Sequence, residues 1–496
     1  RHTEPLQVPA EPELSPIGPE GLPEDSLTQE YLLADRRATI SVYILCRVLI
    51  AIFEQSNLES ITPDLAYKLE DIVFTQIREV EPPQILSSSI RLANWRIYGQ
   101  VLGHMSRLDF TNVSFRFTQQ LDIWQQDFAK SHQTTAAREF ESRLELLLLS
   151  MRHLHITATR EAAPTVCDFL RNLASLFSDA HGPQVKQAYC QLFERLLTVV
   201  ASHPECFQAV PKWINFIEII NARLSNMILK TRHWAIGYPL SIVLLCVSPL
   251  EVFAAQWLPM VTGMANKLKD RVTRGPALQA ICQLTWTYLS RVSEPAQSRV
   301  RRLDEVIKMV FPQGRKTHIG SELPVSTPLV QLIRILGYAA QDICFRSIIF
   351  PMVHYDMFQS SRTLKIENMD PERMVVGIRG FLAIMSDLER DEHVSPPFPS
   401  FNIQSPAFDG LPSSPESMIK SNVDLNSPKR STFEDETPSS LPVNIAKLDE
   451  NARQYYLQFC QILGKITILC DNTFGGQATL NEKFSSTTNL TPKTPL

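Results

Sequence analysis

The sequence predicts an all-α protein in which HEAT- or armadillo-like helical repeats stack into an α-solenoid. First, apolar residues recur at helical spacing in segments of roughly 15–25 residues that prolines separate. Second, the chain has only 17 glycines in 496 residues, which argues against turn-rich β folds and nucleotide-binding α/β folds. Third, a short motif recurs at the repeat period of such arrays, roughly 40–47 residues.

The recurring motif combines an acidic residue, a Val, a basic residue and small and apolar residues, where the second helix of a repeat would begin. It runs from Asp270 to Ile281, with an earlier copy from Asp179 to Leu192 and a degraded copy in Lys230–Ala235. The corresponding positions are 46 and 41 residues apart: Val185, Thr231 and Val272. Because such arrays offer extended surfaces that hold partners, the motif predicts a scaffold.

Composition divides the chain into five predicted segments. In order, these are a disordered Pro/Glu-rich segment (1–26), the repeat array (27–390), a disordered Ser/Pro-rich linker (391–442), a helix that docks back on the array (443–470) and a disordered tail (471–496). Within the array, two prolines and two glycines mark a predicted loop at residues 311–327.

Within the predicted array, helical stripes follow one another between prolines, which suit the first turn of a helix. The first stripe is a long amphipathic one from Ile40 to Phe53, and similar stripes cover Glu139–Ile156 and Trp213–Ile228. After the loop, helical patterning resumes over 328–350 and 371–389. Few segments alternate apolar and polar residues as strands would, so we expect helices throughout.

Charge and cysteine usage bound the function. The net charge of -4 and the isoelectric point near 6.3 predict no strong attraction to nucleic acid or acidic lipid. The nine cysteines are scattered without a C-x-x-C pair, which is typical of reduced core residues in a cytosolic protein.

The longest apolar runs, Ile40–Phe53 and Tyr238–Val247, are too short to span a bilayer, and Arg47 interrupts the first. We therefore expect no transmembrane segment. The start at Arg1 without Met indicates a fragment of a longer protein.

No pattern of catalytic residues stands out in the sequence. There is no G-x-S-x-G elbow, H-E-x-x-H pair or Cys/His cluster with metal-ligand spacing. The segment Gly314–Thr317 lacks the glycine order of a phosphate-binding loop, so a solvated loop is the preferred interpretation. His153 and His155 are two apart on a predicted helix and would point in different directions. The sequence thus predicts a non-enzyme with no cofactor and no metal; an enzyme with a site assembled from distant residues is the remaining alternative.

One basic run is the candidate partner-binding site. Lys267, Lys269 and Arg271 lie within five residues of one another and could meet an acidic partner. The competing interpretation, which we favour, is a charged helix turn in which Asp270 and Arg274 bridge successive repeats. In the Ser/Pro-rich linker, Ser-Pro and Thr-Pro pairs predict phosphorylation at two residues, Ser427 and Thr437.

Three separated strings resemble the N-terminal region of the Furry-type cell morphogenesis proteins, in particular the fungal Tao/Mor/Pag-like scaffolds. The first runs from Arg232 to Pro239 and continues with Leu244–Pro249 and Trp257. The second is Leu284–Glu294 and the third is Pro371–Ile384, in the same order as in that family. The resemblance covers about 27–389. The Ser/Pro-rich insertion that follows is similar to those of fungal members.

The resemblance implies an array of HEAT/armadillo-like repeats that serves as a scaffold for an NDR-type kinase and its Mob co-activator. The implied role is polarised growth and cell morphogenesis, in the cytoplasm at the cell cortex or at growth sites. The family implies no catalytic residues, and we expect its strings to contribute structural positions: Trp234, Tyr238, Pro239, Trp257, Trp286 and Tyr288. For the tryptophans, inter-repeat core is preferred over a binding surface. The alternative function is a helical-repeat adaptor for membrane trafficking or a small GTPase.

Overall fold

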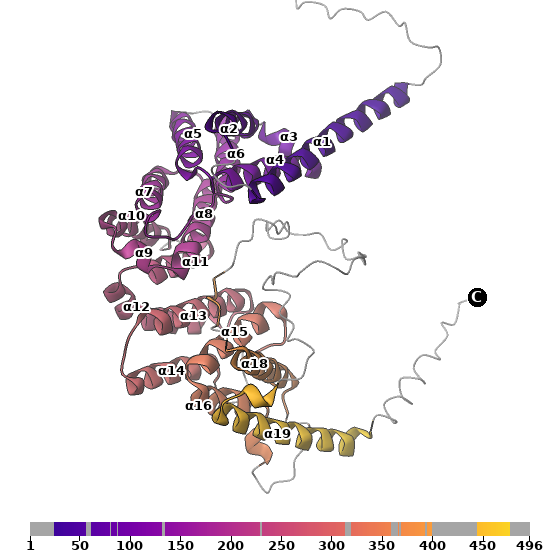
Figure 1. The fold of residues 1–496 in the computed structure, drawn as a ribbon, viewed down its shortest axis with the longest axis vertical. Helices are drawn as coiled ribbons and strands as arrows, with labels where there is room; N and C mark the ends of the chain where they lie inside the picture. Colours follow the sequence, from indigo (N-terminus) through magenta and orange to yellow (C-terminus); the bar gives the residue numbers. More distant parts are fainter. Residues whose placement is uncertain are drawn as a thin grey trace, which may run out of the picture. The chain divides into compact units, whose positions relative to one another are not determined.

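The computed structural model describes residues 24–55, 61–79, 81–86, 88–130, 134–228, 231–312, 319–358, 366, 369–391, 394–398 and 444–476. All regular elements in these ranges are helices, and none of the described residues forms a strand (Figure 1). The all-α prediction is therefore confirmed. The chain separates into two compact units, residues 1–113 with 153–155, and residues 114–152 with 156–496.

The first unit is built around one helix that contacts its neighbours on several sides. Its helices are α1 (Glu24–Gln55), α2 (Pro63–Arg78), α3 (Pro82–Leu86) and α4 (Ser89–Met105), followed by the start of α5 (Phe110–Lys130). Helix α4 packs against α1, α2 and α3, and it buries Trp95, Val101 and Leu102. The buried apolar side chains of α4 thus form the centre of this unit.

The segment 153–155 completes the first unit by lying against α4. The Ser106 hydroxyl accepts a hydrogen bond from the His155 backbone N–H at 2.9 Å. Gly103 permits this approach, because a Cβ there would lie 2.2 Å from the His153 carbonyl oxygen. The helix predicted to reach Ile156 ends at Met151, so the prediction that His153 and His155 share a helix is wrong. The hydrogen bond from His155 to Ser106, the residue that follows α4, is made in place of a further helical turn.

Helix α1 is longer than the apolar run that predicted it. Its part from Gln29 to Gln55 is long and apolar enough, by length and composition, to cross a membrane, and 17% of its most apolar window is buried. The run Ile40–Phe53 is by itself too short to cross a bilayer, so the candidate span depends on the longer helix. The helix gains its extra length from residues before Ile40, where the apolar block Tyr31–Ala34 is followed by the charged residues 35–37.

The second unit contains the remaining helices. They are α6 (Thr134–Met151), α7 (Ala163–Asp179), α8 (Pro183–Ser202), α9 (Glu205–Gln208), α10 (Pro211–Ile228), α11 (Thr231–Val247), α12 (Leu250–Lys267), α13 (Arg271–Arg291), α14 (Ala296–Val310), α15 (Leu323–Ala339), α16 (Gln341–Cys344), α17 (Phe350–Met352), α18 (Pro371–Arg390) and α19 (Glu450–Phe474). A π-helical turn, η2 (Phe345–Ile349), joins α16 to α17, and short 3-10 turns occur at Tyr355–Phe358 (η3) and Ile445–Lys447 (η5).

Successive helices of the second unit pack on one another in order along the chain. One row of contacts runs from α6 to α8, α11, α13, α15 and α18, and α7 with α10, and α12 with α14, pack beside it. In α10 the predicted apolar stripe is buried, with Trp213, Phe216 and Ile220 among its members. Within the row, α11 and α13 bury consecutive residues, 242–247 and 280–285, so neighbours cover them on more than one side.

The repeated sequence motif marks helix starts, but its copies do not occupy equivalent positions. Asp270 caps α13, because its carboxylate accepts from the Val272 N–H at 3.2 Å, whereas Asp179 is the last residue of α7. Val185 is buried in α8, while Val272 is 82% exposed at the start of α13. The motif therefore records the local chemistry of beginning a helix rather than a shared core position.

Some helix boundaries differ from those of the composition-based segments. Helix α1 begins at Glu24, and α15 begins at Leu323 inside the range 311–327. Pro324 lies in the first turn of α15, where a proline has no hydrogen bond to lose. Residues 394–398, which composition places in the linker, pack on the second unit through the buried Phe398. Pro324 contributes to the loop predicted at 311–327, whereas in the structure it lies at the beginning of α15.

Candidate functional site

The basic turn (Lys267, Lys269 and Arg271) lies on the surface between α12 and α13. All three side chains are exposed, and the intervening Leu268 is fully buried. The buried Leu268 anchors the turn, and the three cationic side chains extend from it toward solvent. The structure thus brings the predicted basic residues together on one exposed turn.

Asp270 and Arg274, which we expected to bridge successive repeats, make local contacts within this described turn. The Arg274 Nε donates instead to the Leu268 carbonyl oxygen at 2.9 Å, and Asp270 is occupied as the cap of α13. An ion pair across helices is made by Arg271, whose Nη2 lies 2.8 Å from Oε1 of Glu322, the residue immediately before α15. Both partners are largely exposed, so this pair contributes less than about 1 kcal/mol.

Trp257 and Tyr288, two residues of the family-like strings, form one buried aromatic stack between α12 and α13. Their ring centroids are 4.1 Å apart, and the planes are inclined by 15°. The Tyr288 hydroxyl donates to the Glu294 carboxylate at 3.1 Å, which satisfies its polar end. Burial, together with this carboxylate, raises the pKa of Tyr288 to about 12. Both residues contribute to the packing between the two helices.

The other family-like residues lie in α11 and α13. The Tyr238 hydroxyl donates to the Met260 sulfur at 2.8 Å, and burial raises the Tyr238 pKa to about 12. Pro239 is half-buried inside α11, and Trp286 meets Phe398 edge-on at a centroid distance of 5.8 Å. Trp234 lies in α11, but its side chain is outside the description, and the candidate phosphorylation sites, Ser427 and Thr437, lie outside the described residues.

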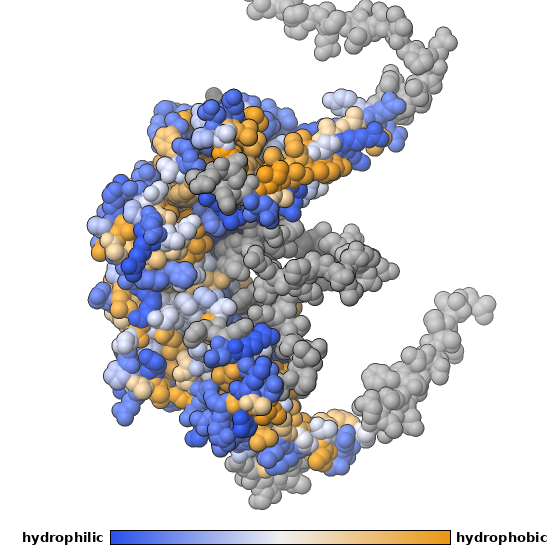
Figure 2. Space-filling model, viewed as in Figure 1, coloured by the Kyte–Doolittle hydropathy of each residue, from blue (hydrophilic) through white to orange (hydrophobic). Residues whose placement is uncertain are grey.

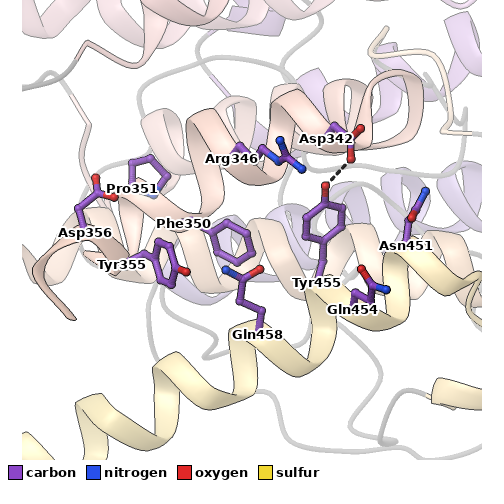
Figure 3. Close-up of a pocket in the computed structure, with 10 residues that line it drawn as sticks. All are labelled: Asp342, Arg346, Phe350, Pro351, Tyr355, Asp356, Asn451, Gln454, Tyr455 and Gln458. Carbon is purple, nitrogen blue, oxygen red and sulfur yellow. Dashed lines mark hydrogen bonds between the residues drawn. The ribbon is translucent and has the colours of Figure 1, made fainter. Parts of the chain in front are cut away.

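A polar surface pocket of about 550 Å³ lies between α19 and the segment from α16 to η3. Figure 3 shows the ten residues that line it: Asp342, Arg346, Phe350, Pro351, Tyr355, Asp356, Asn451, Gln454, Tyr455 and Gln458. Gln458 of α19 lies beside the ring of Phe350, and Asn451 and Gln454 lie farther along α19. Such a lining can hydrogen-bond and stack on a bound group.

The ring of Tyr455, in the lining of this pocket, packs against the π-helical turn η2. Tyr455 stacks on Phe345 of η2 at a centroid distance of 4.5 Å and lies 5.9 Å from Phe350. Its hydroxyl donates to the Asp342 carboxylate (Figure 3). Burial, then Asp342, raises the pKa of Tyr455, so it remains a hydrogen-bond donor at neutral pH.

Sequence reasoning missed this pocket because its two walls are far apart in the chain. Asp342 and Tyr455 are 113 residues apart, and neither belongs to a motif. The available signal was the apolar stripe of the helix now seen as α19. Within the described residues, no group of three or more His, Cys, Asp or Glu side chains is placed to hold a metal ion.

These features define an all-α protein whose described sites are a charged helix turn, buried aromatic stacks and a polar surface pocket. The chain belongs to the family described as cell morphogenesis N-terminal, which it matches over residues 35–496. The resemblance to Furry-type morphogenesis proteins is thereby confirmed.

Two named fungal proteins are similar to the chain. It is 28% identical over 366 residues to cell morphogenesis protein PAG1 of Saccharomyces cerevisiae, an alignment that covers 73% of this chain and 15% of that protein. It is also 28% identical over 365 residues to cell polarity protein mor2 of Schizosaccharomyces pombe, with 72% and 16% covered. The chain thus spans about a sixth of the length of these relatives. No solved structure matches it.

Proposed function

We propose that this chain is a non-catalytic scaffold segment that holds an NDR-type kinase and its Mob co-activator during polarised growth and cell morphogenesis. The family match over residues 35–496 carries the proposal. The two relatives are named for cell morphogenesis and cell polarity rather than for an enzymatic activity, which supports the same role. The proposed location is the cytoplasm, at the cell cortex or at sites of polarised growth.

The proposed architecture is a HEAT/armadillo-like solenoid over residues 27–390. The successive packing of α8, α11, α13, α15 and α18 supports it, because each helix of the row contacts the next. In such arrays a partner docks across several repeats by many modest contacts. Holding a kinase in this way raises its effective concentration near substrates without any chemistry by the scaffold.

The proposed docking surface includes the basic turn. Lys267, Lys269 and Arg271 are exposed, and a partner's carboxylate would compete with Glu322 for Arg271. Peripheral charges of this kind act mainly on association rate and partner choice. An acidic surface on the kinase or co-activator would be the complementary partner. Ser427 and Thr437 are proposed as phosphorylation sites that regulate this docking.

A pull-down of the full chain with a purified NDR-type kinase and Mob co-activator, at two salt concentrations, tests the proposal. We expect both proteins to be retained at moderate salt and less at high salt, because exposed charges are screened. The charge reversal K267E/K269E/R271E should weaken retention. The control R301E/K447E/K465E changes three other exposed cations by the same net charge and should bind as the unmodified chain does.

Loss of retention in both variants would mean that net charge, and not the basic turn, governs binding. If the folded chain retains neither protein, kinase docking by this segment is wrong. Tight binding to a small GTPase in the same assay would then favour the adaptor function.

A further inference from the structure

Helix α1 has a long apolar face that the rest of the described chain leaves exposed. Nine of its large apolar side chains are between 38% and 76% exposed: Tyr31, Leu32, Leu33, Ile40, Tyr43, Ile44, Leu45, Val48 and Ile52. Figure 2 shows this face as a hydrophobic band along α1. A surface helix normally has one apolar side, so a helix that is apolar on both sides indicates a second contact surface.

The two apolar sides of α1 have different neighbours. Cys46, Ile50 and Phe53 are about 5% exposed or less on the side that packs against α4. On the outer side, four β-branched residues recur at a spacing of four and are 50–56% exposed: Ile40, Ile44, Val48 and Ile52. We call these four residues the α1 ridge. Residues four apart lie one above the other on a helix, so they form one continuous row.

The contacts with α4 conflict with a membrane-crossing orientation of α1. Asn94 donates to the Thr39 carbonyl oxygen at 2.8 Å, and Arg91 lies 3.6 Å from Asp35, so α1 is held along α4 by polar as well as apolar contacts. Crossing a bilayer would separate these partners. The exposed Arg47 would also lie midway along the crossing segment, where a charge is costly.

Charged side chains beside the α1 ridge are mainly cationic. Arg36, Arg37 and Arg47 are exposed, and Arg37 and Arg47 occupy the helical rows on either side of the ridge. A second copy of α1 would bring like charges together and would offer few carboxylates in return. The charges therefore favour a partner that carries carboxylates beside its own apolar stripe.

The shape of the α1 ridge favours a helix over a lipid surface. β-Branched side chains have few rotamers and form stiff knobs, which suit packing between helices. Two small residues, Ser41 and Ala51, lie in the rows beside the ridge and leave shallow grooves for the knobs of another helix. Membrane-surface helices more often present Trp, Phe or Leu.

We propose that the α1 ridge, with Arg37 and Arg47 beside it, is a docking surface for an acidic amphipathic helix of a partner protein. The partner's apolar residues pack along Ile40, Ile44 and Val48, and its carboxylates pair with the two arginines. This contact is separate from the basic turn, which lies in the other unit.

Fluorescence anisotropy with a designed probe tests the docking surface. The probe is a labelled three-heptad helical peptide with Leu at the a and d positions and Glu at the flanking positions; a matched peptide has Lys instead of Glu. We expect the full chain to bind the Glu peptide at least about tenfold more tightly than the Lys peptide. The variant R37E/R47E should reverse this preference.

Ridge variants separate apolar docking from charge attraction alone. I44E/V48E should abolish binding of the Glu peptide, whereas V272E/L323E, which changes two apolar residues that are 82% and 68% exposed elsewhere, should not. All four positions are exposed, and circular dichroism checks that each variant is folded. Equal binding of the two peptides, no binding of the Glu peptide, or binding retained by I44E/V48E would overturn the proposal.

Two further readouts identify the other occupants. Co-sedimentation with phosphatidylserine vesicles that I44E/V48E abolishes, without peptide binding, would assign the ridge to a membrane surface and overturn the proposal. A dimer in light scattering that the same variant dissociates would assign it to a second copy of the chain, with the same consequence.

Discussion

His104 is a buried ionisable side chain near the end of α4, in the centre of the first unit. Its side chain is 2% exposed, and neither ring nitrogen has a hydrogen-bond partner among the described residues. Burial lowers the pKa of His104, and the charges of Arg107, His155 and Arg47 add to this effect. Glu54, 3.9 Å away, opposes it. The folded state therefore prefers the neutral imidazole.

We predict that acidification destabilises the first unit partly through His104. Because its pKa is lower in the folded state, the unfolded chain binds the proton more readily. The stability that the neutral His104 contributes is therefore fully present above the unfolded pKa of about 6.5, and it is lost as the pH drops toward the folded pKa. Urea unfolding at pH 7.5 and pH 5.5 should show a smaller acid loss for His104→Leu than for the unmodified chain. An equal loss in both would contradict the prediction, since His155 and His354 titrate in both chains.

At the scale of helices, α15 and α18 illustrate how two elements are locked together. Arg334 on α15 meets Asp387 on α18 through two hydrogen bonds, from Nη2 at 2.7 Å and from Nε at 2.9 Å. Gly337 lets the helices approach, because a Cβ there would lie 2.4 Å from Ile384 Cδ1. A bidentate pair and a close backbone approach thus fix the same helix pair.

We predict that Asp387→Ala destabilises the second unit by about 3 kcal/mol, because it leaves a mostly buried guanidinium without its carboxylate. The Arg334 side chain is 18% exposed and that of Asp387 is 9% exposed, so water replaces little of the lost interaction. Urea unfolding measures the loss. The double variant R334M/D387M should lose less than Asp387→Ala, and a larger loss would show that the pair is not the reason.

At the scale of the whole molecule, contacts concentrate within the two units. We predict two thermal transitions in calorimetry, each sensitive to one unit. Gly103→Ala should lower the free energy of unfolding of the first unit by about 1–3 kcal/mol, because the added Cβ would collide with the His153 carbonyl oxygen. Trp257→Ala, which removes the ring that stacks on Tyr288, should lower the free energy of unfolding of the second unit by about 3–5 kcal/mol. A single transition that both variants lower equally would show that the chain unfolds as one cooperative body.

The candidate site was predictable in part. The basic turn was found from its cluster of Lys and Arg, which is a local property of the chain. The partner of Arg271 was not, since Glu322 is 51 residues away, and neither was the pocket at Tyr455. The Arg274 side chain donates to the nearby Leu268 carbonyl oxygen, and Asp270 caps α13, so both residues make local contacts.

By itself, the sequence determined the all-α class, the approximate course of the helices and the family resemblance. Helical periodicity and capping are contacts between residues three or four apart, so a single chain segment contains all the information. Only the tertiary structure decided which apolar face becomes core. Trp213 is buried against its neighbours, whereas Ile44, also on an apolar stripe of a helix, stays exposed. That choice depends on which distant segment covers each face, and periodicity does not encode it.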